Sequence, residues 1–402
     1  MLPATRLVNR AARATLSRLR CISAAMSGQT PPAAAARSPP SGARAGRRRL
    51  VMRAAAETQQ EQPGEEGIRW VDSSDMIKGA YALVPTYTKD THKGQHGKVC
   101  VVGGCREYTG APYFAAMSAL RVGADLAHVI CTPGAAPVIK GYSPELIVLP
   151  FLPEEDAPAD AAALEALAAK VRPWLGRISV LVVGPGLGDD PAVVSMARII
   201  MKEARAARLP LLVDGSGLNI VAQDPDLVRG YDRCILTPNL PEFGRLAAGV
   251  GLQLDGAIGP QWQDQAGDLA AAFDGPVVLS KGPVDAMTNT VIWAECEDSS
   301  SKRRAGGQGD ILAGAVSAFM CWAFPRSPGG GGGGDGGDGR AALMHAAYGG
   351  CAVVRRAAWR AGSEKGRSML AGDIIPCLAD AFKVYFKERP DPSELQPGST
   401  HQ

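Results

Sequence analysis

Short apolar runs rich in β-branched residues alternate along the chain with longer stretches of helical periodicity. Several of the short runs are apolar at nearly every position, which is the pattern of strands covered on both faces of a sheet. The predicted strands are 98–104, 126–132, 146–151, 178–186, 210–217, 233–239, 276–282 and 291–295. The predicted helices are 111–123, 160–172, 191–207, 240–248, 263–273, 309–323, 341–361 and 371–387.

This order of elements indicates the fold class. Strand, helix and strand repeated over about 200 residues imply right-handed crossovers and a mainly parallel sheet. We therefore predict a three-layer α/β fold, with a mainly parallel central sheet and helices on both faces. One domain, 70–390, is the simplest interpretation. It contains a glycine-rich segment, 327–340, that predicts a flexible surface insertion, and a disordered tail, 391–402, follows it.

The first 56 residues differ in composition from the rest of the chain. Residues 1–56 contain eleven arginines and no Asp, Glu or Lys, and they are rich in Ala, Ser and Pro. This composition is typical of an organelle transit peptide, and its Ala, Pro and Ser content favours the chloroplast over the mitochondrion. A disordered arm that repels itself is the alternative interpretation. An acidic, Gln-rich spacer, 57–69, separates this leader from the domain.

The charge and hydropathy of the remaining chain limit the classes of partner. The net charge is +3 overall, but without the leader there are 32 basic and 40 acidic residues, or −8. A mildly acidic body argues against a nucleic-acid partner, whose phosphates need a basic face. No run approaches the ~18 uncharged apolar residues of a membrane-spanning helix, so we expect no membrane partner. The sequence does not fix the oligomeric state, and a homo-oligomer stays open.

The cysteines and histidines form no recognisable disulfide or metal motif. The nine cysteines are scattered without a Cys-x-x-Cys pair, and we interpret them as reduced, mostly buried thiols. His92 and His96 are four residues apart, but Gly94 and Gly97 oppose the helix that would bring them together. We therefore expect a loop near the site at these histidines, and no protein metal centre.

Glycine-rich and polar turns follow most of the predicted strands. In an open parallel sheet, ligands bind beyond the carboxyl ends of the strands. Glycines there let the backbone turn tightly and approach a ligand, while Asp, Asn, Glu and Lys supply polar contacts. The five turns are GGCREYTGAP, GPGLGDDP, DGSGLN, TPNLPEF and KGPVD. Together they predict a ligand site along this edge of the sheet.

The stretch GGQGD, before the apolar helix, is the most specific of these signals. Gly306, Gly307 and Gly309 can present successive backbone N–H groups, and the positive end of the helix dipole lies beside them. Both features favour a phosphate oxygen. The simpler alternative is that Asp310 is an N-cap and the glycines form a plain loop. However, a cap needs one acceptor, whereas three glycines and a carboxylate suit an anion hole with a base beside it.

The chemistry that fits this stretch is phosphoryl transfer. An Asp310 carboxylate beside a bound γ-phosphate would accept the proton of a substrate hydroxyl as that hydroxyl attacks phosphorus. Donors at the helix end would neutralise the charge on the transferring oxygens. The chain has no G-x-x-x-x-G-K-[ST] loop, and neither GKVCVVGG nor GPGLGD is a G-x-G-x-x-G fingerprint, which disfavours a standard nicotinamide dehydrogenase.

These blocks resemble the NAD(P)H-hydrate dehydratases, which are members of the ribokinase-like superfamily, and look most like their ATP-dependent eukaryotic branch. The resemblance covers about residues 70 to 390. It rests on HKGQHGKVCVVGGCREYTGAPYFAAMSALRVGADLAHVIC, AAPVIKGYSPELIV, VVGPGLG, VDGSGLN, LTPNLPEFGRL, KGPVD, GGQGDILAG and GRSMLAGDII. So many ordered blocks make the resemblance specific, whereas GGQGD alone would indicate only the anion hole of the superfamily.

The resemblance implies a ribokinase-like fold and a repair activity. Members of this family restore NADH and NADPH whose nicotinamide ring has taken up water at C6. By implication, ATP phosphorylates the added hydroxyl of the S-epimer, called NADHX or NADPHX, and phosphate then leaves by elimination. NAD(P)H returns, and ADP and phosphate are released. The enzyme would thus be a carbon–oxygen lyase that uses ATP as co-substrate together with Mg²⁺.

The resemblance also implies which residues form the site. Asp310 would reach the ring hydroxyl as the catalytic base. The implied contacts with the hydrated dinucleotide are Gly110, Asn239, Leu240, Pro241, Glu242, Phe243, Gly244, Arg245 and Asp310. The implied ATP contacts are Lys281, Gly282, Pro283, Val284, Asp285, Ser300, Ser301, Lys302, Arg303, Arg304, Ala305, Gly306, Gly307, Gln308 and Gly309. Asn239 with Glu242 also resembles the N-x-x-E element of the superfamily, which sits near magnesium and phosphate, usually through water.

Two other functions stay open. A ribokinase-like kinase acting on a small molecule such as a vitamin precursor would share the phosphorylation step but would release a stable phosphate ester. A non-catalytic nucleotide-binding module would keep the glycines for their shape. Binding alone does not need a base, so the presence of Asp310 argues against that module.

Overall fold

The computed structural model describes residues 69–156, 160–254, 262–325 and 339–387. The described strands form one ten-stranded sheet in the order β1-β10-β9-β8-β7-β6-β5-β2-β3-β4. Within it, β9 runs antiparallel to its neighbours β8 and β10, and the remaining pairs are parallel. The strands are β1 Arg69–Trp70, β2 Lys98–Val102, β3 Leu126–Ile130, β4 Leu146–Leu149, β5 Val180–Val183, β6 Leu211–Val213, β7 Cys234–Leu236, β8 Val277–Ser280, β9 Asp285–Thr288 and β10 Ile292–Cys296.

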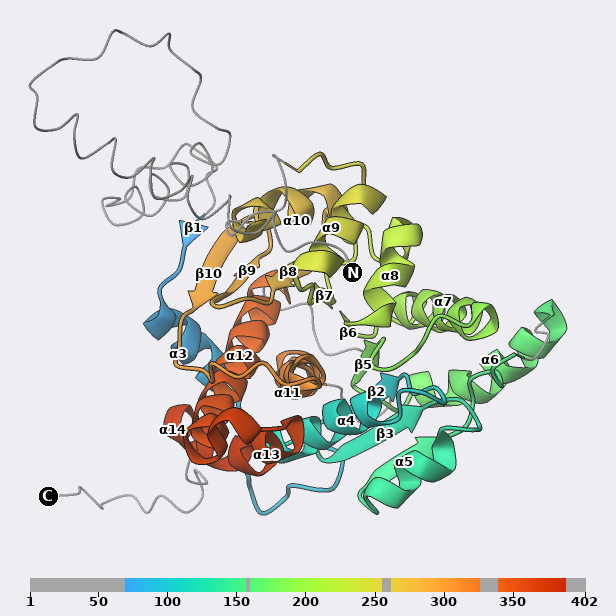
Figure 1. Cartoon of the computed structure of the whole chain (residues 1–402), viewed down its shortest axis with the longest axis horizontal. Helices are drawn as coiled ribbons and strands as arrows, with labels where there is room; N and C mark the ends of the chain where they lie inside the picture. Colours follow the sequence, from blue (N-terminus) through green and yellow to red (C-terminus); the bar gives the residue numbers. More distant parts are fainter. Residues whose placement is uncertain (1–68, 157–159, 255–261, 326–338, 388–402) are drawn as a thin grey trace, which may run out of the picture. The chain divides into compact units, whose positions relative to one another are not determined.

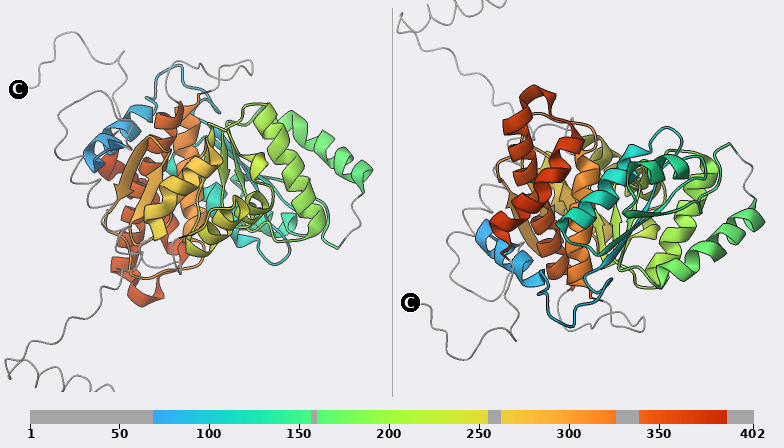
Figure 2. Two further views of the ribbon diagram at one scale, coloured as in Figure 1. Left: turned by 90° about the horizontal axis from the view of Figure 1, so that it is seen from above. Right: turned by 90° about the horizontal axis from the view of Figure 1, so that it is seen from below.

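Helices cover both faces of this sheet (Figure 1; Figure 2). One face carries α3 Ser73–Leu83, α4 Gly110–Val122, α5 Ala136–Tyr142, α11 Gln308–Ala323, α12 Gly339–Lys365, α13 Ala371–Ile374 and α14 Leu378–Tyr385. The other face carries α6 Ala161–Leu175, α7 Pro191–Ala206, α8 Ser216–Gln223, α9 Leu240–Gly249 and α10 Ala266–Phe273. Short 3₁₀ turns lie at Pro225–Leu227, Trp262–Gln265, Gly366–Ser368 and Ile375–Cys377. The predicted three-layer arrangement is therefore confirmed.

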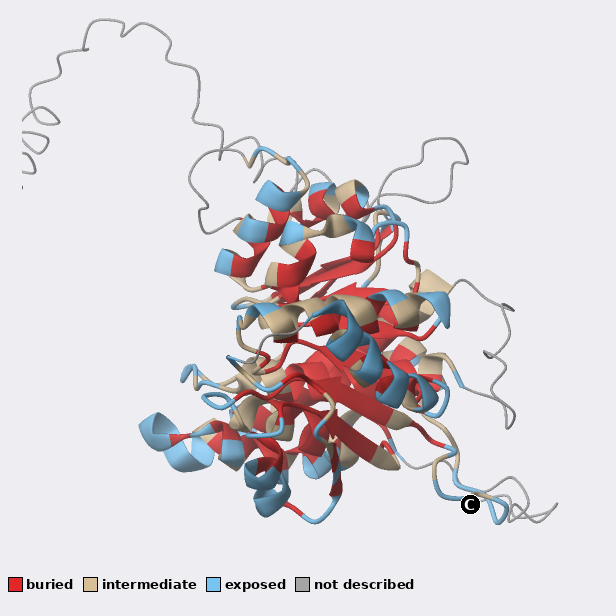
Figure 3. Cartoon of the chain, turned by 90° about the vertical axis from the view of Figure 1, so that its right-hand side faces the viewer, coloured by how far each residue is buried: buried red, intermediate tan, exposed pale blue. Residues whose placement is uncertain are grey.

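Alternate residues of each central strand face the two helical layers. In β2, Val99 and Val101 belong to the hydrophobic core on the α11 side, whereas Cys100 and Val102 belong to the core on the α7 side. Successive side chains of a strand point to opposite faces, so a strand with two covered faces must be apolar throughout. Figure 3 shows the consequence, because the strands are buried while the helices expose their outer surfaces.

Helix α11 packs closely between α12 and α4, and Figure 1 looks almost along its axis. Glycines make these contacts close. A Cβ atom built on Gly314 would lie 2.0 Å from the carbonyl oxygen of Ala115 in α4. A Cβ atom built on Gly350 of α12 would lie 2.5 Å from Cγ2 of Val316 in α11. This packing fixes the position of the amino end of α11, where the GGQGD stretch lies.

The observed strands and helices differ from the predicted ones where contacts between distant residues determine the secondary structure. The eight predicted strands are present, and two further strands, β1 and β9, form by pairing with neighbours. Helices α3, α5 and α8 were not predicted. The predicted helix 371–387 is divided into α13, a 3₁₀ turn and α14, and Pro376 lies in the first turn of that 3₁₀ segment. Proline cannot donate the backbone hydrogen bond that a continuous helix needs there.

Some predictions concern residues outside the described part of the chain. These are the leader, nearly all of the acidic spacer, most of the glycine-rich segment and the tail after residue 387. Gly339 and Arg340, which we had placed in the glycine-rich insertion, belong instead to the first turn of α12. None of the described helices combines the length and the apolar character that a membrane-spanning segment needs.

Candidate active site

The turns that follow β2, β5, β6, β7 and β8 lie next to one another at the carboxyl edge of the sheet. The N–H of Gly104 donates to the carbonyl of Gly186 at 3.0 Å, which joins the turns after β2 and β5. A Cβ atom built on Gly184 would lie 1.8 Å from the carbonyl oxygen of Asp214, so the turns after β5 and β6 touch. The N–H of Lys281 donates to the carbonyl of Pro238 at 2.9 Å. The five turns therefore meet, as predicted.

At the centre of this edge, the ammonium of Lys281 lies among three carboxylates. Its Nζ is 2.5 Å from Oδ1 of Asp214 and 3.7 Å from Oε2 of Glu242. Asp310, in the first turn of α11, is the third carboxylate. Oδ1 of Asp214 also accepts a hydrogen bond of 2.7 Å from Oγ1 of Thr237. A single lysine thus faces more negative charge than it can neutralise.

Glu242 is held by the start of α9. Asn239 is the N-cap of this helix, and its side chain accepts from the N–H of Glu242 at 3.1 Å. The carboxylate of Glu242 accepts in turn from the N–H of Asn239 at 2.8 Å. This reciprocal capping box fixes both side chains at the helix end. The local sequence NLPE therefore explains why Glu242 points toward Lys281.

The amino end of α11 is open, and Asp310 is not its N-cap. The N-cap is Gly307, which has φ +91° and offers no side chain to the first N–H groups. The alternative in which Asp310 caps the helix is therefore wrong, because Asp310 is the third residue of α11. A Cβ atom built on Gly309 would lie 3.4 Å from Nζ of Lys281. The uncapped N–H groups and the lysine thus lie on the same side of the site.

Asp310 is half-buried, and its environment disfavours the charged form. Burial is the main cause that raises the pKa of Asp310 to about 7, and the charges of Asp214 and Glu242 raise it further. Lys281 acts in the opposite direction. Burial also raises the pKa of Glu242. For Lys281, burial lowers the pKa, but Asp214 and Glu242 outweigh it, so the ammonium stays charged with a raised pKa. A carboxylate that titrates near neutral pH suits a general base.

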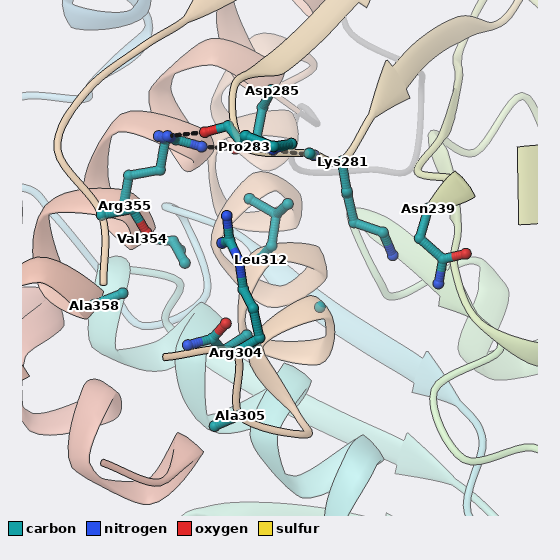
Figure 4. Close-up of a pocket in the computed structure, with 14 residues that line it drawn as sticks. Asn239, Lys281, Pro283, Asp285, Arg304, Ala305, Leu312, Val354, Arg355 and Ala358 are labelled. Carbon is teal, nitrogen blue, oxygen red and sulfur yellow. Dashed lines mark hydrogen bonds and ion pairs between the residues drawn. The ribbon is translucent and has the colours of Figure 1, made fainter. Parts of the chain in front are cut away.

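A pocket of about 440 Å³ opens beside this cluster (Figure 4). Its volume lies in the range of small-molecule sites. Lys281 and Asn239 lie at one side of it, and Arg304 extends from its loop into it. Nine lining residues are among the predicted ATP contacts: Lys281, Gly282, Pro283, Asp285, Ser300, Arg304, Ala305, Gln308 and Gly309. The remaining lining residues are Asn239, Leu312, Val354, Arg355 and Ala358.

The turn KGPVD, which forms one wall of the pocket, is held by two buried side chains. Nη1 of Arg355 lies 3.0 Å from Oδ2 of Asp285, and Nη2 donates to the carbonyl of Pro283 at 2.6 Å. Nε2 of Gln263 donates to the carbonyls of Ser280 and Val284, each at 2.8 Å. The structure thus places Asp285 in a buried ion pair with Arg355, and it places the carbonyl of Val284 in a hydrogen bond with Gln263.

The other predicted ATP residues lie along the loop before α11. Ser301, Lys302 and Arg303 line a second groove, of about 820 Å³, together with Trp359 and Arg367. Ser300 and Arg304 border both the groove and the pocket. Gly306 is exposed, and Gly307 contacts the ring of Phe114, with 2.8 Å from a built Cβ to Cδ2.

The predicted dinucleotide contacts fall on two elements. Gly110 begins α4, one turn before Phe114, which contacts Gly307. On α9, Nε of Arg245 donates to Oδ1 of Asn219 at 2.7 Å, and Leu240, Pro241 and Gly244 are at least partly exposed. Phe243 is different, because its side chain is fully buried and its ring centroid is 4.9 Å from that of Trp262. Its side chain therefore belongs to the core and does not reach a substrate.

Sequence reasoning missed several residues that shape this site. Asp214 lies in the turn DGSGLN, which we had placed at the ligand edge without assigning a role to its carboxylate. Thr237 precedes Asn239 in the next turn, and its hydroxyl is buried. Arg355 lies in α12, 70 residues beyond the end of the turn that it holds. No local pattern marks an arginine in a long helix as part of a distant turn.

The histidine loop does not lie near the site. It precedes β2, and Nε1 of Trp322 in the last turn of α11 donates to the carbonyl of His96 at 2.8 Å. The site lies at the first turn of α11, and its 16 residues span roughly 24 Å. The expectation of a loop near the site was therefore wrong. It is a loop at the opposite edge of the sheet, because the chain enters β2 there.

The described cysteines are mostly buried, as predicted. Eight of them are free, and all except Cys377 are buried. Among the described residues, one group has a spacing that would allow a metal, namely Cys105, Glu107 and Glu155. Burial is the main cause that raises the pKa of the Cys105 thiol, which keeps it protonated and a poor ligand.

Comparisons with known proteins agree with this geometry. A family model described as NAD(P)H-hydrate dehydratase matches residues 99–379. Two of the most similar curated relatives are named ATP-dependent (S)-NAD(P)H-hydrate dehydratase. That of Bos taurus is 42% identical over 323 residues, covering 79% of this chain and 91% of the relative. That of Vitis vinifera is 44% identical over 306 residues, covering 75% and 85%.

Solved structures show the same fold. An ADP/ATP-dependent NAD(P)H-hydrate dehydratase from Bacillus subtilis, co-crystallized with ATP/Mg²⁺, has a TM-score of 0.54 at 19% identity, covering 77% of this chain and 97% of that one. A ribokinase-like superfamily protein from Enterococcus faecalis V583 has a TM-score of 0.57 at 19% identity, covering 81% and 99%. At such identities these likenesses concern the fold alone, whereas the family match and the curated relatives concern the sequence. The chain therefore belongs to the NAD(P)H-hydrate dehydratase family.

Proposed function

We propose that this protein dehydrates the S-epimer of hydrated NADH or NADPH at the expense of ATP, and so restores NAD(P)H. The observation that carries the proposal is the position of Asp310. It is half-buried in the first turn of an uncapped helix, close to a lysine that borders a pocket of nucleotide size. The name shared by the relatives, ATP-dependent (S)-NAD(P)H-hydrate dehydratase, supports this activity. Residues 70–390 form the catalytic domain in this proposal.

ATP occupies the pocket beside Lys281. Its adenosine lies against the apolar wall formed by Leu312, Val354 and Ala358. Its phosphates extend toward the uncapped N–H groups of α11, where Lys281 and Arg304 supply positive charge. Within the described residues, the guanidinium of Arg304 forms no ion pair, so it is free to bind an anion.

The dinucleotide lies on the other side of Asp310, between the start of α4 and the start of α9. Asp310 takes the proton of the ring hydroxyl, and the hydroxyl oxygen attacks the γ-phosphorus of ATP while the bond to the leaving ADP breaks. The phosphate ester then eliminates phosphate from C6, and loss of the proton at C5 re-forms the ring double bond. The balance is one ATP and one hydrated dinucleotide converted to ADP, phosphate and NAD(P)H.

The residues present fit a magnesium ion that accompanies ATP. The carboxylates of this cluster outnumber its one ammonium, which leaves negative charge for a cation, and Glu242 is the residue that would hold the ion through water. Within the described residues, Oε1 of Glu242 accepts no hydrogen bond, so it can accept from metal-bound water. When bound, Mg²⁺ would supply charge neutralisation for the transferring phosphoryl group.

The test is to incubate the chain from residue 57 onward with hydrated NADH, Mg²⁺ and either ATP or ADP. We expect the absorbance of the reduced nicotinamide ring to return with ATP. A phosphorylated product that accumulates without this absorbance would instead identify a small-molecule kinase. Asp310→Asn is the matched variant, and we expect it to retain ATP binding while turnover falls by about 10²–10⁴. Full turnover in that variant would contradict the role of the base.

We also propose that residues 1–56 direct import into an organelle, the chloroplast in preference to the mitochondrion. Their arginine content, the absence of acidic residues and the abundance of Ala, Pro and Ser support this proposal. A fluorescent protein fused after residue 56 should accumulate in that organelle. A fusion with the arginines of the leader replaced by glutamine is the control, and it should stay outside.

A further inference from the structure

Asp214 is a buried carboxylate whose surroundings hold it rigidly. Only 3% of its surface is exposed. Its N–H donates to the carbonyl of Val183 at 3.0 Å, and its carbonyl accepts from the N–H of Gly217 at 3.0 Å. Its Oδ1 accepts from the hydroxyl of Thr237 at 2.7 Å and from Nζ of Lys281 at 2.5 Å. The backbone and the side chain of Asp214 are therefore both fixed before any ligand arrives.

The position of the Lys281 ammonium depends on this carboxylate. Lysine has a flexible four-carbon stem, so its charge can move within a site unless a partner holds it. The ion pairs of Lys281 within the described residues go to Asp214 and, at a longer distance, to Glu242, and none goes to Asp310. Yet Lys281 lies close to the first turn of α11, 3.4 Å from a Cβ built on Gly309. Without Asp214, the carboxylates left to attract the ammonium are Glu242 and Asp310, and Asp310 is the one on that helix.

A direct ion pair between Lys281 and Asp310 would impair catalysis. A carboxylate paired with an ammonium is stabilised as the anion and becomes a weaker base. It would also have one oxygen occupied, where the proton of the substrate hydroxyl must bind. The lysine would at the same time be drawn away from the phosphate side of the pocket.

We propose that Asp214 is a positioning residue of the reaction, which holds the ammonium of Lys281 beside the nucleotide pocket and keeps it from pairing with Asp310. This inference rests on the proposed function, because it assigns Asp310 as the base. Asp214 itself touches neither the nucleotide nor the reacting atoms in this account. It acts through Lys281, whose ammonium its charge holds, while Thr237 adds a hydrogen bond to the same carboxylate oxygen.

The charges that face Asp310 predict in which direction each variant shifts the pKa of Asp310. They are Asp214 from the turn after β6, Glu242 from α9 and Lys281 from the turn after β8. Asp214→Asn removes one charge that raises the pKa of Asp310 and releases the charge that lowers it. The acid limb of the pH profile of kcat should therefore move to lower pH. Lys281→Gln removes the opposing cation and should move the same limb to higher pH.

The experiment is a double-mutant cycle with Asp214→Asn, Lys281→Gln and the two combined, in which kcat and KM for ATP are measured from pH 5 to 9. For Asp214→Asn we expect kcat at pH 8 to fall about 10-fold or more and the acid limb to fall by roughly one unit. The larger change should be in kcat, because the nucleotide pocket stays intact. In the Lys281→Gln background, Asp214→Asn should cost much less in kcat, since the lysine through which it acts is gone.

Two further variants separate charge from packing. Thr237→Val removes the hydroxyl that holds Asp214 but keeps the carboxylate, so the acid limb should stay in place. Asp268→Asn removes an exposed carboxylate of α10 and should leave kcat and KM for ATP unchanged. If Asp214→Asn does not fold, the double variant, which removes both charges of the buried pair, provides the comparison with Lys281→Gln alone.

The outcomes are distinguishable. An unshifted acid limb in Asp214→Asn, or an equal loss of kcat with and without Lys281, would overturn the positioning role. A limb that moves equally in Thr237→Val would also overturn it, because packing would then be the cause. A wild-type enzyme that restores no NADH would contradict the proposed function itself, before any variant is compared.

Discussion

Arg355 of α12 forms a buried ion pair with Asp285 directly beneath the turn that begins with Lys281. The two side chains are 8% and 9% exposed, and Nη1 lies 3.0 Å from Oδ2. The same guanidinium donates to the carbonyl of Pro283, and Oδ1 of Asp285 accepts from the N–H of Gly282 at 3.0 Å. The C-terminal helical layer therefore shapes the turn KGPVD, which the proposed function assigns to ATP.

Breaking this pair from one side should be costly. Arg355→Met leaves the Asp285 carboxylate buried without its partner, and we expect the free energy of unfolding to fall by about 3–5 kcal/mol in urea titrations. Replacing both members, by Arg355→Met with Asp285→Leu, should recover part of this loss because no buried charge remains. If the double variant is no more stable than the single one, the ion pair is not the cause of the loss.

Turnover should depend on pH through Asp310. The carboxylate acts as a base only when it is deprotonated, and its pKa is raised to about 7 by burial first and then by Asp214 and Glu242. We therefore expect kcat to rise as pH increases through about 7 and to reach a plateau above it. The acid limb should be absent from the residual activity of Asp310→Asn, measured over the same buffers.

The same pKa shift has a consequence for stability. A carboxyl group whose pKa is higher in the folded state contributes stability below its unfolded pKa, and this contribution is lost as pH rises through the folded pKa. Asp310 should thus weaken the fold between about pH 4 and pH 7. Asp310→Asn, which is never charged, should melt above the wild type at pH 8 and close to it at pH 4. A melting difference that does not change with pH would show that this titration does not affect the fold.

Arg304 should contribute to ATP affinity, and Arg367 should not. Arg304 extends into the pocket, whereas Arg367 lines only the second groove. A charge-assisted hydrogen bond contributes about 1.5–3 kcal/mol, so Arg304→Ala should raise KM for ATP by roughly 10- to 100-fold. Arg367→Ala is the matched control, and its KM should stay near that of the wild type. If both variants raised KM for ATP equally, the nucleotide would lie in the second groove, which both arginines line.

Close packing of α11 on α4 should make Gly314 intolerant of a side chain. Gly314→Ala would place a methyl group 2.0 Å from the carbonyl oxygen of Ala115, and we expect a loss of about 1–3 kcal/mol in the free energy of unfolding. Gly141 lies in helix α5 with no atom within 4 Å of a built Cβ. Gly141→Ala should therefore be neutral or stabilise by up to about 1 kcal/mol. A neutral Gly314→Ala would show that the two helices can separate at little cost.

The chain itself specified the layers and the edge where the site lies. Strands such as β2 and β5 are apolar at every buried position, so a sheet covered on both faces followed from the pattern alone. The glycines and carboxylates that follow the strands could be recognised from short stretches of sequence. A tight turn needs glycine at a set position after the strand, and a helix start needs its N–H groups within its first turn. The GGQGD stretch therefore pointed to Asp310 as the candidate base. The structure was needed to show that Gly307, and not Asp310, caps α11.

Tertiary structure decided what no local pattern encodes. Strand β9 forms because β8 and β10 pair with it, and Lys281 pairs with Asp214, which lies 67 residues away. The distant Arg355 reaches its turn because α12 packs across the sheet. Periodicity and turn chemistry report only on neighbours along the chain. Ion pairs, burial and the pKa of a carboxylate depend on which residues the fold brings together, and these alone give Asp310 the environment of a base.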